Sequence, residues 1–279
     1  NREKDIDFTI TNQVADYIKK NKKEAILLDC YHETCSNYYT DATTIPEDTE
    51  CIIVLGGDGT ILQAAHDIAG MDIPILGINL GTLGFLAEIE LHNIYEALDG
   101  LFNDEYTFEN RMMLYACIKR NGKKMYHGNA LNDVVVARSG FSRIISLSIC
   151  VNNELVSRYR GDGVIISTPT GSTGYNLSSG GPVVKPDSQV IVLTPISPHS
   201  LNSRSIVLNA DDQITVRVDK SKKTQEEEAI ATFDGKEAIL LHEDDIIEIE
   251  KAKVETKLIK FDHSNFFDTL RAKIGQCED

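Results

Sequence analysis

One aspartate in the sequence lies among three glycines, in a segment whose residue types suit phosphate chemistry. Residues 56–60 read Gly-Gly-Asp-Gly-Thr and follow a continuous apolar run. Glycines let a backbone turn tightly and approach a ligand, and the N–H groups at the start of a following helix attract anions. Asp58, for which we expect no packing role, would bind a divalent cation or orient a sugar hydroxyl for attack. A plain glycine turn capped by Asp58 is the alternative.

A second segment contains a predicted strand that runs into a series of hydroxyl-bearing residues. Residues 160–176 read Arg-Gly-Asp-Gly-Val-Ile-Ile-Ser-Thr-Pro-Thr-Gly-Ser-Thr-Gly-Tyr-Asn. Ser and Thr hydroxyls can donate to phosphate or ribose oxygens, small residues permit close approach, and Tyr175 can stack on a base. An ordinary surface loop contains the same residue types, so this segment alone leaves both interpretations open.

An asparagine and an aspartate precede another apolar strand. Residues 129–136 read Asn-Ala-Leu-Asn-Asp-Val-Val-Val. The Asn132 amide offers a donor and an acceptor to an adenine edge or a ribose, and the Asp133 carboxylate can accept from a ribose hydroxyl. An Asx turn before a strand explains the same pair without a ligand.

Taken together, these segments resemble the NAD kinase family, which combines GGDGT with GDG…TPTGSTAY and with an Asn-Glu or Asn-Asp pair. Gly174 is a departure, because the family usually has Ala there, and the missing methyl should enlarge the pocket slightly. The GGDGT turn alone also resembles diacylglycerol and sphingosine kinases and, in shortened form, phosphofructokinases. Shorter likenesses to the family occur at 81–87, 198–208, 233–235 and 265–271.

The resemblance implies an enzyme that transfers a phosphoryl group from ATP to the adenosine-ribose 2′-hydroxyl of NAD. It implies Mg²⁺ or another divalent metal with ATP, without a set of protein metal ligands, and a homodimer or homotetramer. Asp58 would be the catalytic residue, and Phe85 would face the nicotinamide side. The expected NAD contacts are Gly59, Phe85, Asn132, Asp133, Asp162, Thr170, Thr173, Gly174 and Tyr175. The expected phosphate and ATP contacts are Gly56, Gly57, Thr60, Ser172 and Asn176.

Two other functions stay open at this point. A lipid kinase of the diacylglycerol or sphingosine type shares the GGDGT turn, although a lipid acceptor calls for an apolar channel or a membrane-facing surface. A dinucleotide-binding regulator without turnover would keep the same contacts. For the kinase itself, NAD and NADH are both candidate acceptors, and ATP and polyphosphate are both candidate donors.

The pattern of apolar residues predicts domains of different class. Residues 1–103 alternate strand-like and helix-like runs, as in a doubly wound, Rossmann-like α/β domain. Residues 104–260 contain many short β-branched runs separated by turn dipeptides, which indicates a mainly β domain. Residues 261–279 regain helical spacing, and this C-terminal helix should pack back on the first domain. We also expect a first strand before residue 1, because such domains usually open with one.

The elements that must position the candidate residues follow from the same pattern. The expected helices cover 8–21, 61–69, 91–102 and 264–274, the last with Ser264 as its cap and Gly275 as its stop. The expected strands cover 25–28, 51–55, 75–78, 114–118, 134–136, 144–151, 164–167, 190–193, 214–218, 229–233 and 246–249. Turns are expected at 121–122, 152–153 and 234–235, and a charged hairpin tip at 220–228.

Composition narrows the class of partners. The 279 residues carry a formal charge of −15, which disfavours nucleic acid and acidic membranes. A bound nucleotide would need local positive charge from Lys, Arg, a metal ion or converging N–H groups. No apolar run approaches the roughly 20 residues of a membrane helix, and no signal peptide is visible at the start. The six cysteines show no CxxC pairing, which favours reduced thiols in the cytoplasm.

Overall fold

The protein divides into two compact units. The computed structural model describes residues 4–28, 42–87, 89–140, 144–200, 203–220, 229–236, 238–261 and 265–274. The first unit comprises residues 1–110 and 256–279, and the second comprises residues 111–255. Two long strands, β4 (Thr107–Arg120) and β15 (Ile246–Lys260), each begin in one unit and end in the other. In the described part of the chain, no helix is long and apolar enough to cross a membrane.

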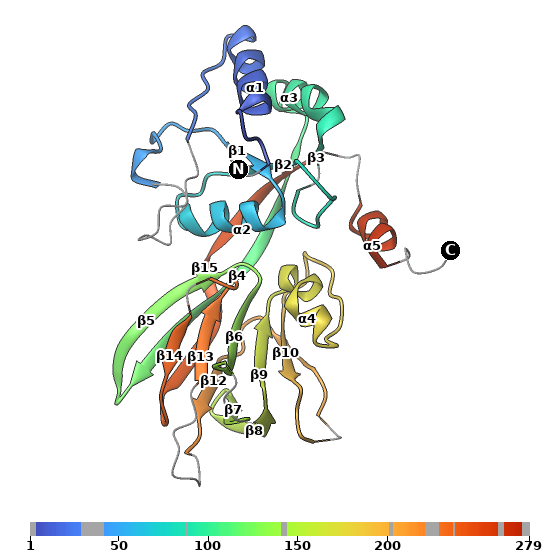
Figure 1. The fold of residues 1–279 in the computed structure, drawn as a ribbon. Helices are drawn as coiled ribbons and strands as arrows, with labels where there is room; N and C mark the ends of the chain where they lie inside the picture. Colours follow the sequence, from blue (N-terminus) through green and yellow to red (C-terminus); the bar gives the residue numbers. More distant parts are fainter. Residues whose placement is uncertain are drawn as a thin grey trace. The chain divides into compact units, whose positions relative to one another are not determined.

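The first unit is a parallel sheet with helices on both faces. Strand β1 (Ile52–Gly56) pairs in parallel with β2 (Ile75–Asn79), and β2 pairs in parallel with β3 (Ile89–Glu90) and with the end of β15. Helices α1 (Thr9–Lys20) and α3 (Ile94–Phe102) cover one face, and α2 (Asp58–Asp67) covers the other (Figure 1). The remaining elements are α5 (Phe266–Ile274) and the short 3-10 helices η1 (Ala42–Thr44) and η2 (Leu91–Asn93).

Apolar side chains from the helices and the central strand form the core of this unit. Val14 and Ile18 of α1 and Leu98 of α3 pack with Leu76 and Ile78 of β2. Every residue of β2 is buried, as expected of a strand that is covered on both faces. The doubly wound, Rossmann-like class predicted for this part of the chain is confirmed.

One predicted strand of the first unit is wrong. Residues 25–28 have no regular secondary structure, and the side chains of Ile26 and Leu27 are 54% and 52% exposed. An apolar run becomes a strand only when its backbone pairs with a neighbour, and no described strand pairs with these residues. Helix α2 also begins earlier than the predicted residue 61, because its first turn includes Asp58.

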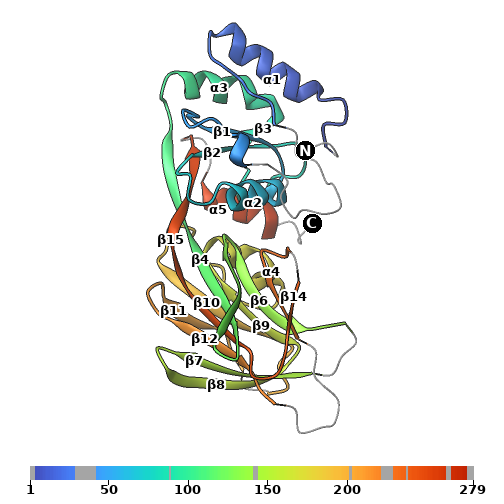
Figure 2. The same ribbon diagram turned by 90° about the vertical axis from the view of Figure 1, so that its left-hand side faces the viewer.

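The second unit consists of two antiparallel sheets around one core. One sheet runs β8 (Glu154–Gly161), β7 (Ile145–Val151), β12 (Ile214–Val218), β15, with β4 also on β15 and β5 (Lys123–Ala130) on β4. The other runs β11 (Ile206–Asn209), β10 (Val190–Ile196), β9 (Gly163–Ser167), β6 (Asp133–Arg138), β13 (Ala229–Phe233), β14 (Ile239–Leu241). Figure 2 shows these strands from the side. The segment after β9 forms η3 (Thr170–Thr173) and α4 (Tyr175–Ser178).

Alternating residues from both sheets fill that core. Leu114 of β4, Val136 of β6, Ile166 of β9, Val216 of β12 and Ile249 of β15 belong to one buried cluster. The mainly β class predicted for this part of the chain is therefore confirmed.

The predicted turns of the second unit form tight connections with left-handed backbone. Asn121 and Gly122, with φ of 50° and 74°, join β4 to β5, and Asn152 and Asn153 join β7 to β8. Positive φ at both central residues matches the twist of the flanking strands. The predicted tip after Lys220, the Ser264 cap and the Gly275 stop lie outside the described residues.

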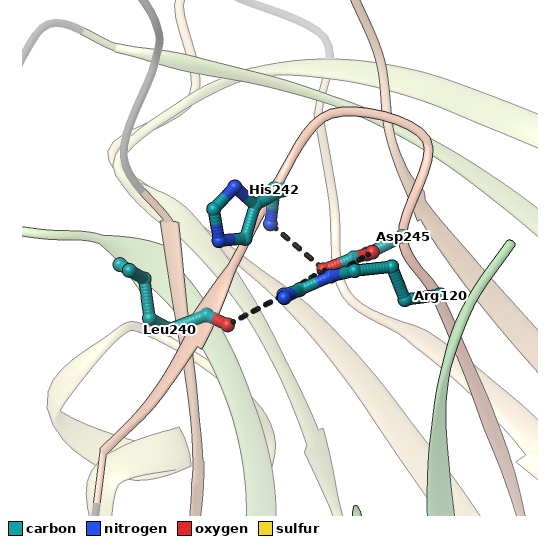
Figure 3. A network of polar contacts seen from close by, with 4 residues as sticks. All are labelled: Arg120, Leu240, His242 and Asp245. Carbon is teal, nitrogen blue, oxygen red and sulfur yellow. Dashed lines mark hydrogen bonds and ion pairs between the residues drawn. The ribbon is translucent and has the colours of Figure 1, made fainter. Parts of the chain in front are cut away.

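In the second unit, an ion pair between half-buried Arg120 and buried Asp245 joins the end of β4 to the segment between β14 and β15 (Figure 3). Arg120, the last residue of β4, donates from Nε and Nη2 to the Asp245 carboxylate at 2.8–3.2 Å. The same guanidinium donates to the Leu240 carbonyl at 3.1 Å, and the His242 N–H donates to Asp245 at 2.8 Å. Asp245 is 1% exposed, so these donors replace water as the partners of a buried negative charge.

Arg120→Met should destabilise the protein by roughly 2 kcal/mol or more, because it leaves the Asp245 charge buried without its cation. Thermal and urea unfolding measure the loss. Arg158→Met, at an exposed arginine of the same unit, is the matched control and should change stability by less than about 0.5 kcal/mol. Equal stability of the two variants would contradict the assignment of this ion pair.

Candidate active site

The carboxyl ends of two parallel strands bring two loops of the first unit together. The register pairs Gly56 at the end of β1 with Asn79 at the end of β2. The GGDGT turn follows β1, and the loop 80–87 follows β2, so both emerge at one edge of the sheet. Ligands of doubly wound proteins bind at this edge.

The GGDGT turn is built around Gly56 and the first turn of α2. A methyl group on Gly56 would collide with the Thr60 side chain, so this position requires glycine. Gly57 is the extended N-cap of α2, and its carbonyl accepts from the Thr60 N–H at 2.9 Å. The Thr60 N–H, which we expected to bind phosphate, is therefore engaged within the turn. Asp58 and Gly59 begin the helix, where N–H groups lack intrahelical partners, and nothing lies within 4 Å of a methyl placed on Gly59.

The Asp58 carboxylate is tied to the loop after β2. One oxygen accepts from the Phe85 N–H at 2.8 Å, and the other accepts from the N–H groups of Leu86 and Ala87 at 3.1 and 3.2 Å. Gly84 lies so close that any side chain there would collide with this carboxylate. Our expectation that Asp58 has no packing role is wrong. A carboxylate has about four acceptor positions, so three donors orient it and leave one position for a hydroxyl.

The loop 80–87 is itself held at both ends. Buried Asn79 accepts from the Gly81 N–H at 3.0 Å and donates to the Gly81 carbonyl at 3.1 Å. The Phe85 ring lies 5.9 Å from the ring of Phe266 in α5, and the Lys273 ammonium lies 5.3 Å from the Phe85 ring centre. The structure thus places Phe85 between the GGDGT turn and the C-terminal helix, within the first unit.

In the second unit, the hydroxyl-rich segment closes around Asn132. The Thr168 N–H donates to the Asn132 carbonyl at 2.8 Å, and the Thr168 hydroxyl donates to the Leu131 carbonyl at 2.6 Å. Gly171 touches the Asn132 backbone so closely that a methyl there would collide. The Asn132 amide lies 3.6 Å from the position of a methyl on Gly174. The segments singled out separately in the sequence therefore meet here.

The outer part of this turn is open to a ligand. Tyr175 is 47% exposed, and Asn132, Thr173 and Gly174 are half-buried. Its inner part is closed: the Thr170 side chain is buried and accepts from Arg111 Nη1 at 3.2 Å.

Ser172 and Asn176, expected at the phosphate site, are both fully buried. The Ser172 hydroxyl donates to the Pro169 carbonyl at 2.6 Å and accepts from the Val184 N–H at 3.0 Å. Asn176 donates to the carbonyls of Ser172 and Pro182 and accepts from the Thr194 hydroxyl at 2.7 Å. The polar groups of Ser172 and Asn176 are therefore satisfied by interior partners. We assign these residues to stabilising the turn and not to contacting a phosphate.

Asp162 lies apart from this group within the second unit. It precedes β9, whereas the hydroxyl-rich turn follows β9, and the intervening strand separates the two by roughly 17 Å at 3.3 Å per residue. The Asp162 carboxylate accepts from Arg138 Nε at 2.6 Å. The structure does not bring Asp162 to Asn132 and Tyr175 in one copy of the second unit.

A half-buried aspartate, which the sequence alone did not place in the site, supports the Asn-Asp pair. Asp234 accepts from the N–H groups of Leu131, Asn132 and Asp133 at 2.7–3.0 Å. Burial raises the pKa of Asp234, against the lowering effect of these N–H donors. Burial, followed by the nearby negative charge of Asp234, raises the pKa of Asp133 to about 7. The resemblance at 233–235 was the available signal for Asp234.

The two units together define a class. The glycine-flanked aspartate begins a helix of the α/β unit, and the hydroxyl-rich turn lies in the β unit, which are the features expected from the sequence of a kinase that carries the GGDGT turn. Family models of the ATP-NAD kinase N-terminal domain and C-terminal domain match residues 4–106 and 131–261. The chain belongs to the ATP-NAD kinase family.

Individual relatives agree with this assignment. An NAD kinase of Lachnoclostridium phytofermentans is 53% identical over 99% of this chain and 96% of its own length. An NAD kinase of Thermoanaerobacter pseudethanolicus is 41% identical over 99% and 97%. Among solved structures, an Archaeoglobus fulgidus NAD kinase in complex with ATP aligns with a TM-score of 0.76, at 25% identity over 97% of this chain and 96% of that one. A yeast NADH kinase complexed with NADH aligns with a TM-score of 0.77, at 25% identity over 84% and 70%.

The raised pKa of Asp133 predicts a pH-dependent cost to stability. Because the folded pKa of about 7 lies above the unfolded value of 3.8, the folded state holds a proton that the unfolded state releases, and stability falls as the pH rises through this window. Asp133→Asn should remove the cost. Its gain in unfolding free energy should be larger at pH 8 than at pH 5 by roughly 1–3 kcal/mol.

Urea unfolding at both pH values measures this difference. Asp211→Asn, at an exposed aspartate of the same unit, is the control and should follow the wild-type pH dependence. If Asp133→Asn also follows the wild-type curve, Asp133 does not carry the raised pKa.

Proposed function

We propose that this protein is an NAD kinase that transfers the γ-phosphoryl group of ATP to the 2′-hydroxyl of the adenosine ribose of NAD, forming NADP and ADP. The observation that carries the proposal is the Asp58 carboxylate, oriented by the N–H groups of residues 85–87. Support also comes from the family and from relatives whose names specify NAD, NADH and ATP.

Asp58 suits the acceptor hydroxyl. In the transfer, the ribose 2′-oxygen forms a bond to the γ-phosphorus while the bond from that phosphorus to the β,γ-bridging oxygen breaks, and ADP leaves with the electron pair. A carboxylate is a far weaker base than an alkoxide, so the hydroxyl proton passes to Asp58 as the new bond forms and then to water. Because the transition state is loose, orientation and charge stabilisation supply most of the rate enhancement.

Binding of the dinucleotide is assigned to the open surface of the hydroxyl-rich turn. Asn132, Thr173, Gly174 and Tyr175 would contact NAD at this surface. Asp133, expected from the sequence as a further contact, is only 5% exposed, so it and the buried Thr170 would support the surface from below. Gly59, at the start of α2, would contact the ribose beside Asp58. Phe85 is assigned to the nicotinamide side, as the family resemblance implies. Asp162 would contact NAD only if the dinucleotide extended from the hydroxyl-rich turn to the opposite end of β9.

The metal ion would bind to the protein together with ATP, the phosphoryl donor. Among the described residues, no three His, Cys, Asp or Glu side chains gather where they could share a metal ion. Mg²⁺ commonly binds through one or two carboxylates plus substrate phosphates, so ATP oxygens would hold most of its coordination sphere. The ion would neutralise phosphate charge.

We also propose that the protein acts in the cytoplasm as a homodimer or homotetramer, in line with the family. A lipid acceptor and a regulator without turnover, both compatible with GGDGT alone, have no support from the relatives, which are named NAD kinases.

Asp58→Asn should lower kcat by roughly 10²–10⁴, because the amide cannot accept the hydroxyl proton. The KM for NAD should stay within about threefold, since the group around Asn132 is unchanged. A coupled assay of NADP formation measures both constants, run in parallel with NADH as acceptor. Asp16→Asn, on the exposed face of α1, is the control and should keep wild-type kinetics. Near-normal turnover of a folded Asp58→Asn protein would overturn the assignment.

Removal of divalent metal with EDTA should abolish NADP formation, and Mg²⁺ should restore it. The melting temperature without nucleotide should shift by less than about 2 °C, because the described residues offer no metal cage whose loss would destabilise the fold. A large fall in melting temperature on EDTA treatment would indicate a structural metal ion. It would contradict the proposal that the ion binds together with ATP.

A further inference from the structure

A lysine near the start of the chain lies against both loops of the first unit. A methyl group placed on Gly57 would be 2.8 Å from Lys4 Nζ, and one placed on Gly81 would be 3.1 Å from the same nitrogen. The ammonium therefore occupies the space that side chains at these two positions would fill. Gly57 belongs to the GGDGT turn and Gly81 to the loop that holds Asp58. Glycine at both positions keeps room for this cation.

The next residue anchors Lys4. The Asp5 carboxylate is buried and accepts from the N–H groups of Ile10 and Thr11 at 3.1 and 2.8 Å and from the Thr11 hydroxyl at 2.7 Å. The Phe8 N–H donates to the Asp5 carbonyl at 3.1 Å. These four hydrogen bonds fix the backbone beside Lys4 to the first turn of α1. The Lys4 side chain therefore extends from a backbone position that is held in place.

Lys4 has no acidic partner among the residues that the structure describes, within the 4.0 Å of an ion pair. Other lysines differ: Lys119, Lys185 and Lys257 each pair with a carboxylate at 2.6–2.7 Å. In a chain of net charge −15, an ammonium that has no acidic partner in the described part of the chain and lies at a glycine-rich turn supplies the local positive potential that a polyphosphate requires. The cavity of about 1740 Å³ beside it is also lined by Gly57, Gly59 and Lys273.

We propose that Lys4 binds the β- and γ-phosphate oxygens of the donor ATP at the GGDGT turn. This inference rests on the proposed function. If Asp58 receives the proton of the attacking hydroxyl, the γ-phosphorus must lie about 3–3.5 Å from that hydroxyl oxygen, hence beside the same turn as Lys4. The ammonium stabilises the negative charge that grows on the β,γ-bridging oxygen as the bond to the γ-phosphorus breaks.

Lys4→Met and Lys4→Arg test the assignment in the full-length protein. With Lys4→Met, kcat/KM for ATP should fall about tenfold or more, whereas the dissociation constant for NAD should stay within about twofold. Lys4→Arg keeps the charge and should recover part of the loss. Lys20→Met, at an exposed lysine of α1 that does not line the cavity, is the matched control and should behave as wild type.

A binding measurement separates this inference from the proposed function. Titration calorimetry with the non-hydrolysable analogue β,γ-imido-ATP should show about tenfold weaker binding to Lys4→Met than to wild type. If wild type makes no NADP, the proposed function fails, and the titration still tests Lys4. If NADP forms but both kcat/KM for ATP and analogue binding stay within twofold in a folded Lys4→Met protein, the role of Lys4 is overturned. An equal loss of affinity for NAD and for the ATP analogue in Lys4→Met would also overturn the role of Lys4.

Discussion

Three backbone N–H groups pointed at one carboxylate are the interaction on which the rest of the first unit depends. They come from Phe85, Leu86 and Ala87, and they orient Asp58 at the start of α2. Charge-assisted hydrogen bonds of this kind are stronger than neutral ones. The turn after β1 and the loop after β2 therefore behave as one body, and Gly84 has no side chain because the carboxylate occupies that space.

The second unit also contains a carboxylate that accepts hydrogen bonds from three backbone N–H groups, but this carboxylate has a different role. Asp234 gathers the N–H groups of residues 131–133, which fixes the Asn132 backbone beneath the hydroxyl-rich turn. The half-buried Asp234 carboxylate fixes the shape of this surface, whereas Asp58 keeps an acceptor position for chemistry. Burial, and after it the neighbouring negative charge of Asp234, raises the pKa of Asp133, so the arrangement that shapes this surface has a cost in stability.

Much of the fold could be predicted from the sequence, because runs of β-branched residues and turn dipeptides indicate local structure. The strands around Val134–Val136 and Ile145–Val151 and the turn at 121–122 are examples. Residues 25–28 have an equally apolar pattern but no described strand to pair with, and pattern alone cannot show that.

The site was harder to predict, for two physical reasons. The donors to Asp58 lie 27–29 residues away, so no local motif reveals them. Ser172 and Asn176 have the side chains of ligand-binding residues, and only burial distinguishes an interior role. Strand direction, in contrast, was readable: Asp162 and the turn after Ser167 lie at opposite ends of β9 and could have been separated from the sequence. Lys4 has no motif around it and was visible only in three dimensions.

The empty space around Gly59 makes the turn accessible to spectroscopy. A methyl group at this position would meet no atom within 4 Å apart from its chain neighbours and the backbone of α2 itself. A small fluorescent amino acid introduced there would follow Asp58 in the chain, in the first turn of α2. Its emission would report when water leaves this part of the surface. It would report binding alone, because the probe replaces Gly59, which is assigned to the ribose contact.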